Sequence, residues 1–142
     1  MSDYSIFRTI GFGSLVLSVL LAAGCELGTK PSSPEGQVKA RAEAYWAAML
    51  AKDYVGAYAH LAPGFRAKVS DKVYAARFAG KTTFRNAEIN KIECAPEVCD
   101  LVVDTKYTVS GIPPFNMDVD AGRAWKQRWI LFEGDWWLLP DK

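Results

Sequence analysis

The chain has 142 residues, 50% of them apolar, and its 17 Lys and Arg residues nearly balance 16 Asp and Glu residues to give a formal net charge of +1. This length predicts one domain with a core of ordinary size and disfavours two-domain arrangements. The near-neutral charge also disfavours nucleic acid as a partner, because neutralisation of phosphates by excess basic residues supplies much of the affinity of nucleic-acid-binding proteins.

The first 24 residues are predicted to be a targeting segment, with Asp3 and Arg8 as their two charged side chains. The apolar run over residues 10 to 23 is shorter than the roughly 20 residues that span a bilayer, so it fits a signal peptide better than an anchor. The sequence LLAAGC at residues 20 to 25 resembles the bacterial lipobox, whose cysteine is diacylated and becomes the mature N-terminus. We therefore expect a lipoprotein signal peptide over residues 1–24 and lipidation of Cys25. The alternatives are ordinary secretion with a free Cys25 thiol, or an uncleaved anchor.

Residues 25–34 are rich in Pro, Ser and Gly and lack apolar periodicity, which is typical of a tether. Such a tether would hold a domain spanning residues 35–142 close to the lipid surface, facing the periplasm of a bacterial cell envelope. By analogy with bacterial lipoproteins, Glu26 is not the aspartate that most often retains them at the inner membrane. We therefore expect the outer membrane in preference to the inner one.

The first part of the domain has helical periodicity. Ser33 followed by Pro34 is typical of a helix start, and apolar residues then recur every three or four positions to about residue 52. Asp53 and Ser70 predict the caps of a second and a third helix, which end near residues 63 and 80. The sequence therefore predicts three N-terminal helices.

After residue 80 the apolar period changes to two, which is typical of β-strands. The pattern predicts four strands, over residues 83–94, 99–109, 123–132 and 136–139, with a long loop over residues 110–122. Helices followed by an antiparallel meander indicate an α+β fold, with the helices packed on one face of a four-stranded sheet.

Several segments resemble the nuclear-transport-factor-2-like superfamily. They are YW at residues 45–46, KDYVGAY at 52–58, LAP at 61–63, FR at 65–66 and the closing WILFEGDWWL at 129–138. The resemblance covers about residues 35 to 140 and implies a cone-shaped fold, with helices closing over a curved sheet and a pocket at the wide end. Members include ketosteroid isomerases, dehydratases, polyketide cyclases, secretion-system subunits and non-catalytic binding domains, so the fold alone does not decide function.

Cys94 and Cys99 lie on either side of a short turn that contains proline. With Cys25 lipidated, they are the remaining partners for each other in an oxidising compartment, and they predict a disulfide across a hairpin. His60 is the single histidine of the chain, so we expect no metal site, and no motif indicates a cofactor.

Continuing the pairing from the two cysteines places Glu88 opposite Thr105 on the inner face of the sheet, whereas Asp104 falls on the charged outer face. Burial raises the pKa of a carboxyl group, which suits general acid or base chemistry. The weak catalytic candidates are Glu88, Tyr107 and Asn86. The alternatives place Glu88 at an open mouth, in an ion pair with Arg123, Lys126 or Arg128, or turned outward by a bulge between residues 86 and 90.

The side chains expected to line a pocket come from the helices and the inner face of the sheet. The aromatic members are equally well explained as core residues, and His60 is better explained as a surface or cap residue than as a base. The pocket candidates are Tyr45, Trp46, Tyr58, Asn90 and Thr105.

The closing hairpin is apolar on both faces. With Gly134 and Asp135 as its turn, Phe132 pairs with Trp137, and the two faces cannot both pack against the helices. We therefore expect an interface that includes Trp129, Trp136 and Trp137. By the family resemblance a second copy covers this face, and an envelope protein is a further partner; the alternative is cover by the N-terminal segment or by residues 112–115.

These observations favour a lipid-anchored periplasmic binding or adaptor domain without catalysis. It would use a pocket for a small apolar ligand, its sheet for a protein partner, or both. The alternative is an isomerase- or dehydratase-type enzyme with Glu88 as the general acid or base, and secretion or envelope-assembly subunits are a third class.

Overall fold

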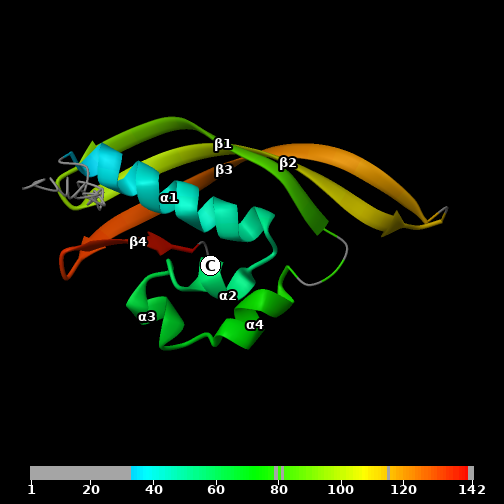
Figure 1. Ribbon diagram of the computed structural model, residues 1–142, viewed down its shortest axis with the longest axis horizontal. Coiled ribbons are helices and arrows are strands. Elements are labelled where there is room, and N and C mark those ends of the chain that lie inside the picture. Colours follow the sequence, from blue (N-terminus) through cyan, green and yellow to red (C-terminus); the bar gives the residue numbers. More distant parts are fainter. Residues whose placement is uncertain (1–32, 79, 81, 115, 141–142) are drawn as a thin grey trace, which may run out of the picture.

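A computed structural model of the chain describes residues 33–78, 80, 82–114 and 116–140. In this part an arched antiparallel sheet covers helix α1, and the shorter helices lie below (Figure 1). The helices are α1 (Pro34–Leu50), α2 (Tyr54–Tyr58), α3 (Pro63–Arg66) and α4 (Asp71–Ala76). The strands are β1 (Thr82–Ala95), β2 (Val98–Ile112), β3 (Met117–Phe132) and β4 (Asp135–Leu139), in the order β1-β2-β3-β4. The α+β fold is confirmed, and the predictions for residues 1 to 32, including Cys25, lie outside the described residues.

The helices begin where the sequence predicts. Ser33, Asp53 and Ser70 each accept a hydrogen bond from the backbone N–H three residues later, which satisfies a donor that the helix start leaves free. Helix α3 is absent from the sequence prediction, because Pro63 and Gly64 predict only the end of α2. Pro63 instead occupies the first turn of α3, where its missing N–H costs no hydrogen bond. None of the described helices has the length and hydropathy needed to cross a membrane.

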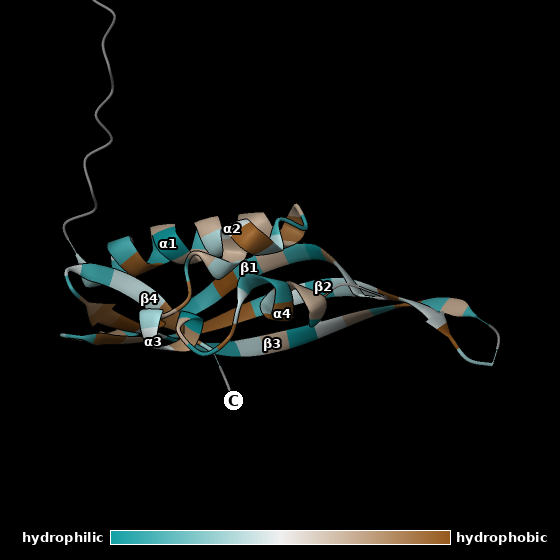
Figure 2. Ribbon diagram, turned by 90° about the horizontal axis from the view of Figure 1, so that it is seen from below, coloured by the Kyte–Doolittle hydropathy of each residue, from teal (hydrophilic) through white to brown (hydrophobic). Residues whose placement is uncertain are grey.

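The predicted loop over residues 110–122 is largely wrong, because β2 continues to Ile112 and β3 already begins at Met117. The two strands form a ribbon that extends past the helices, as Figure 2 shows from below. The β3 side of the ribbon is exposed from Met117 to Asp120, so it carries no alternation of buried and exposed residues. The strand prediction depends on that alternation. The residues Ile112 to Pro114 lie at its far tip and do not cover the closing hairpin (Figure 1).

The pairing of β1 with β2 follows the prediction near the turn and departs from it further along. Cys94 and Cys99 form the predicted disulfide and face each other across the hairpin. The register then shifts at two bulges, at Arg85 and at Asn90. A single inserted residue turns the following side chains to the other face of a strand. The shift at Asn90 therefore places Glu88 opposite Asp104 instead of Thr105.

The closing hairpin turns at Glu133 and Gly134, whose φ angles are 52° and 80°, and not at Gly134 and Asp135. Ile130 therefore pairs with Trp137, a register two residues away from the predicted one. Because a shift of two residues preserves the faces, the predicted division of side chains between them still holds. Trp129 lies on the concave face, under α1.

Candidate functional site

The concave side of the sheet, where the family resemblance implies a pocket, is occupied by aromatic side chains. The ring centroids of Trp46 and Phe84 lie 5.6 Å apart, and those of Tyr45 and Trp129 lie 6.5 Å apart. The hydroxyl groups of Tyr45 and Tyr74 share a hydrogen bond of 3.0 Å. Burial raises the pKa of both tyrosines, and the Tyr45 hydroxyl further raises that of Tyr74. The edge-to-face rings and the tyrosine pair therefore make this side a packed core.

The predicted pocket residues are not gathered around one cavity. Tyr45 and Trp46 belong to this core, and the Tyr58 hydroxyl donates to the backbone carbonyls of residues 66 and 69, which fixes the chain around α3. Thr105 is buried, and its hydroxyl accepts from the Trp125 indole at 2.8 Å and donates to the carbonyl of residue 123. The prediction for Asn90 is wrong, because it is the bulged residue and its exposed amide donates to Asp104.

The catalytic candidates do not converge. Glu88 and Asn86 are exposed and lie opposite Asp104 and Lys106, outside the core. Tyr107 is half-buried on the concave side, opposite Phe84. The prediction that these groups share the inner face is wrong, and the alternative of a bulge between residues 86 and 90 holds, because the bulge at Asn90 turns Glu88 and Asn86 outward. Glu88 borders a groove of about 360 Å³ between α1 and β1 that also contains Lys39 and Glu43.

The prediction of an interface through all three tryptophans of the closing hairpin is wrong for two of them. Trp129 and Trp136 are 0% and 2% exposed and belong to the core, because theirs is the face that the helices cover. Trp137 is half-buried, and its indole donates to the carbonyl of Phe132 at 3.1 Å. The face left open carries Ile130, Phe132 and Leu139 instead.

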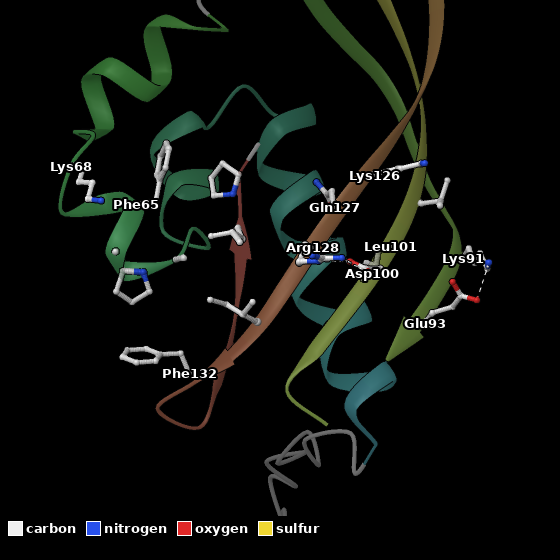
Figure 3. Close-up of a pocket in the computed structure, with 17 residues that line it drawn as sticks. Phe65, Lys68, Lys91, Glu93, Asp100, Leu101, Lys126, Gln127, Arg128 and Phe132 are labelled. Atoms are coloured by element: carbon white, nitrogen blue, oxygen red, sulfur yellow. Dashed lines mark hydrogen bonds and ion pairs between the residues drawn. The ribbon is translucent and has the colours of Figure 1, made fainter. Parts of the chain in front are cut away.

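This open face forms a groove of about 1140 Å³ between α3 and the outer side of the sheet, which we call the outer groove (Figure 3). Phe132 and Leu139 are 47% and 43% exposed, although both are large apolar side chains. The groove does not follow from the sequence prediction, because one of its walls, α3, is absent from that prediction. Its signal in the sequence is the second apolar face of the hairpin. The apolar side chains that line it include Phe65, Val102, Ile130, Phe132, Leu139 and Pro140.

The charged side chains of the outer groove are unevenly paired. Arg128 donates two hydrogen bonds, of 2.8 and 2.9 Å, to the Asp100 carboxylate, and these hold the pKa of Asp100 below its usual range. Lys91 is 2.9 Å from Glu93. Lys68 and Lys126 line the groove without an ion pair in the described part of the chain. The unpaired charge at the groove is therefore positive.

Within the described residues, no group of three or more His, Cys, Asp or Glu side chains is arranged to hold a metal ion. His60 is half-buried between α2 and α3, and its ring meets that of Tyr45 edge-on. Burial, with a smaller contribution from the charge of Arg41, lowers the pKa of His60. His60 is therefore more buried than the surface or helix-cap residue that the sequence predicts.

No family model and no curated protein matches the sequence. Solved structures do match the fold, at probability 1.00. A protein named provisionally as a dehydratase of the nuclear-transport-factor-2-like family, from Streptomyces avermitilis, is 13% identical, with a TM-score of 0.56 over 76% of this chain and 93% of that one. A nuclear-transport-factor-2-like protein from Cytophaga hutchinsonii is 15% identical, with a TM-score of 0.55 over 75% and 93%. A ketosteroid isomerase-like protein from Erwinia carotovora atroseptica is 16% identical, with a TM-score of 0.54 over 76% and 92%.

The domain therefore has the nuclear-transport-factor-2-like fold. At these identities the likeness defines the fold alone, and this fold supports both ligand binding and isomerase- or dehydratase-type chemistry.

Proposed function

We propose that this protein is a lipid-anchored binding domain of the bacterial cell envelope, without catalysis, and that the outer groove is its binding site. The observation that carries the proposal is the contrast between the filled concave side and the open outer groove. Large apolar side chains that remain exposed around one concavity are typical of surfaces that bind a partner or a ligand. The outward position of Glu88 removes the observation that motivated an acid-base role.

The groove favours an amphipathic anion with an acyl-like chain as its ligand. Its apolar floor, which includes Ile130 and Leu139, suits a hydrocarbon chain, because burial contributes about 25 cal/mol per Å² of apolar surface. Lys68 and Lys126, which have no ion pair in the described residues, supply positive charge for the anionic end. A wholly apolar ligand would leave these two ammonium groups without a partner.

Calorimetric titration of dodecanoate into the domain beginning at Ser33 tests the groove. We expect saturable binding that Phe132→Asp weakens at least tenfold, because a carboxylate on the groove wall repels the anion and disrupts the apolar surface. Val55→Asp is the matched control, since Val55 is 59% exposed on α2 and does not line the groove. Equal affinity in the Phe132 and Val55 variants would exclude the outer groove as the site.

A second candidate occupant is another copy of the domain, which the exposure of Phe132 and Leu139 favours. Light scattering after size exclusion distinguishes the two. A dimer that Phe132→Asp converts to a monomer would assign the groove to self-association. A monomer at high concentration would leave it to a ligand.

The anchor is tested separately. In a Gram-negative host, globomycin should cause the precursor to accumulate, and Cys25→Ser should release the protein from the membrane fraction. Density-gradient separation of the two membranes then tests the expectation of the outer membrane. A Cys25→Ser protein that stays membrane-bound would favour an uncleaved anchor.

A further inference from the structure

Three basic residues from different segments lie beside the outer edge of β4, where residues 60 to 62 pair with Leu138. They are Arg41 of α1, His60 from the segment between α2 and α3, and Arg66 of α3. We call them the basic cluster. The guanidinium carbons of Arg41 and Arg66 lie 4.9 and 5.0 Å from the centroid of the same ring, the indole of Trp137. Both guanidinium groups therefore contact the same aromatic ring. The backbone carbonyl of His60 accepts a hydrogen bond from the N–H of Leu138, the residue that follows Trp137, which places His60 next to this edge of the hairpin.

The cluster contains hydrogen-bonding atoms without a partner. The Nε atoms of Arg41 and Arg66 and the Nδ1 atom of His60 are all buried and have no hydrogen-bond partner in the described part of the chain. They are the full set of such side-chain atoms among the described residues. A buried donor left unpaired costs about 1 to 3 kcal/mol, and the two arginine Nε–H groups are such donors, so the cluster favours an acceptor from outside the described chain.

The charges of the cluster are also unbalanced. No carboxylate of the described residues forms an ion pair with Arg41 or Arg66. Elsewhere in the sheet, Arg128 is held by Asp100 in a two-pronged ion pair, so this chain does neutralise an arginine with one of its own carboxylates. Contact with Trp137 contributes about 0.5 to 1 kcal/mol for each arginine, and it does not neutralise their positive charge.

We propose that the basic cluster is a binding site for a phosphate monoester group, with Trp137 as the platform that orients the two arginines. Guanidinium groups match phosphate oxygens with paired N–H donors, and a doubly charged phosphate balances two arginines where a carboxylate balances one. The His60 ring supplies a further nitrogen at the site. The inference does not depend on what occupies the outer groove, because neither arginine lines it.

The single histidine of the chain makes the test direct, because its imidazole resonance needs no assignment among others. Inorganic phosphate is titrated into the full chain in a non-ionic detergent at neutral pH, and the imidazole C–H shift of His60 is followed by NMR. We expect a saturable shift that sodium chloride at the same ionic strength does not produce. Acetate should produce it only at much higher concentration. A shift of equal size in chloride, or tighter binding of acetate than of phosphate, would overturn the proposal.

Variants locate the site. Arg41→Gln and Arg66→Gln should each weaken phosphate binding at least tenfold, whereas Lys39→Gln removes the same charge from the exposed face of α1 and should leave it within twofold. Arg41→Lys and Arg66→Lys retain the charge but not the forked donors, and should weaken binding by less than the Gln variants. Near-ultraviolet circular dichroism verifies that each variant is folded. Unchanged affinity in both Gln variants would exclude the cluster.

The same resonance distinguishes the two sources of such a group. Glycerol 3-phosphate represents a soluble ester, and phosphatidic acid in mixed micelles represents a lipid headgroup. Much tighter binding of phosphatidic acid would assign the site to a lipid, and equal affinity would assign it to a soluble ester. Failure of both to shift His60 would overturn the proposal.

Discussion

Both faces of the closing hairpin are apolar, but one is buried and the other is exposed. On one face Trp129 and Trp136 are buried in the core, and on the other Phe132 and Leu139 remain exposed at the outer groove. The helices cover a single face of the sheet, so burial stabilises the fold on that face only. Apolar side chains on the uncovered face contribute little to the core, and a ligand or partner is their more direct explanation.

Truncating one residue on each face tests this difference in burial with the largest expected effect. Trp129→Ala should lower the free energy of unfolding by about 3 to 5 kcal/mol, because it leaves a large cavity in the core. Phe132→Ala should lower it by less than about 1 kcal/mol, because its side chain is already 47% exposed. Urea denaturation measures both. A larger loss for Phe132→Ala than for Trp129→Ala would contradict the assignment of the faces.

The disulfide supports the concave side, since Cys99 is buried opposite Trp129. Replacing both Cys94 and Cys99 with alanine should lower the free energy of unfolding by about 2 kcal/mol, as a short closed loop restrains the unfolded chain only modestly. Chemical denaturation of this variant and of the oxidised protein gives the difference. An added reductant should then destabilise the original protein and not the variant; equal sensitivity of the two would contradict a structural disulfide.

The hydrogen bond between the hydroxyl groups of Tyr45 and Tyr74 gives a further test of the packed core. Tyr45→Phe should cost about 1 kcal/mol, because the Tyr74 hydroxyl loses its partner. The pKa values of both tyrosines are raised by burial, so the stability they contribute is fully present below their ordinary pKa near 10 and falls as the pH rises above it. Denaturation between pH 8 and 11 should show this fall, and Tyr74→Phe should reduce its slope. An unchanged slope would place the hydroxyls in contact with water.

The smallest expected effect is a shift in the pKa of His60, which lies between α2 and α3. Its pKa is lowered by burial and by Arg41, so the stability that it contributes is present above its ordinary pKa of about 6.5 and is lost as the pH falls below that value. Arg41→Gln should therefore raise the pKa of His60, as measured by NMR titration in phosphate-free buffer. A lower pKa in this variant would contradict the placement of Arg41 beside the ring.

Periodicity and caps were sufficient to predict much of the fold. Ser33, Asp53 and Ser70 marked helix starts, and the two cysteines fixed the pairing next to their turn. Even the wrong register of the closing hairpin preserved its faces, because it was wrong by two residues. Local patterns thus predict which side chains share a face.

The candidate site was not predictable in the same way. The bulges at Arg85 and Asn90 have no strong signature in the sequence, yet the one at Asn90 decides that Glu88 faces outward. The outer groove and the basic cluster join segments far apart in the sequence, and α3, which contributes to both, was not predicted. Such sites depend on packing between elements, which periodicity within one element does not report.

Methyl NMR of the domain beginning at Ser33, during titration with dodecanoate, tests directly whether the ligand binds in the outer groove. The methyl resonances of Ile130 and Leu139, in the outer groove, should shift first and saturate. Those of Val38 and Val103, which are buried in the core beneath the sheet, should change little. Shifts confined to Val38 and Val103 would contradict the account, because they would mean that the concave side opens to bind the ligand.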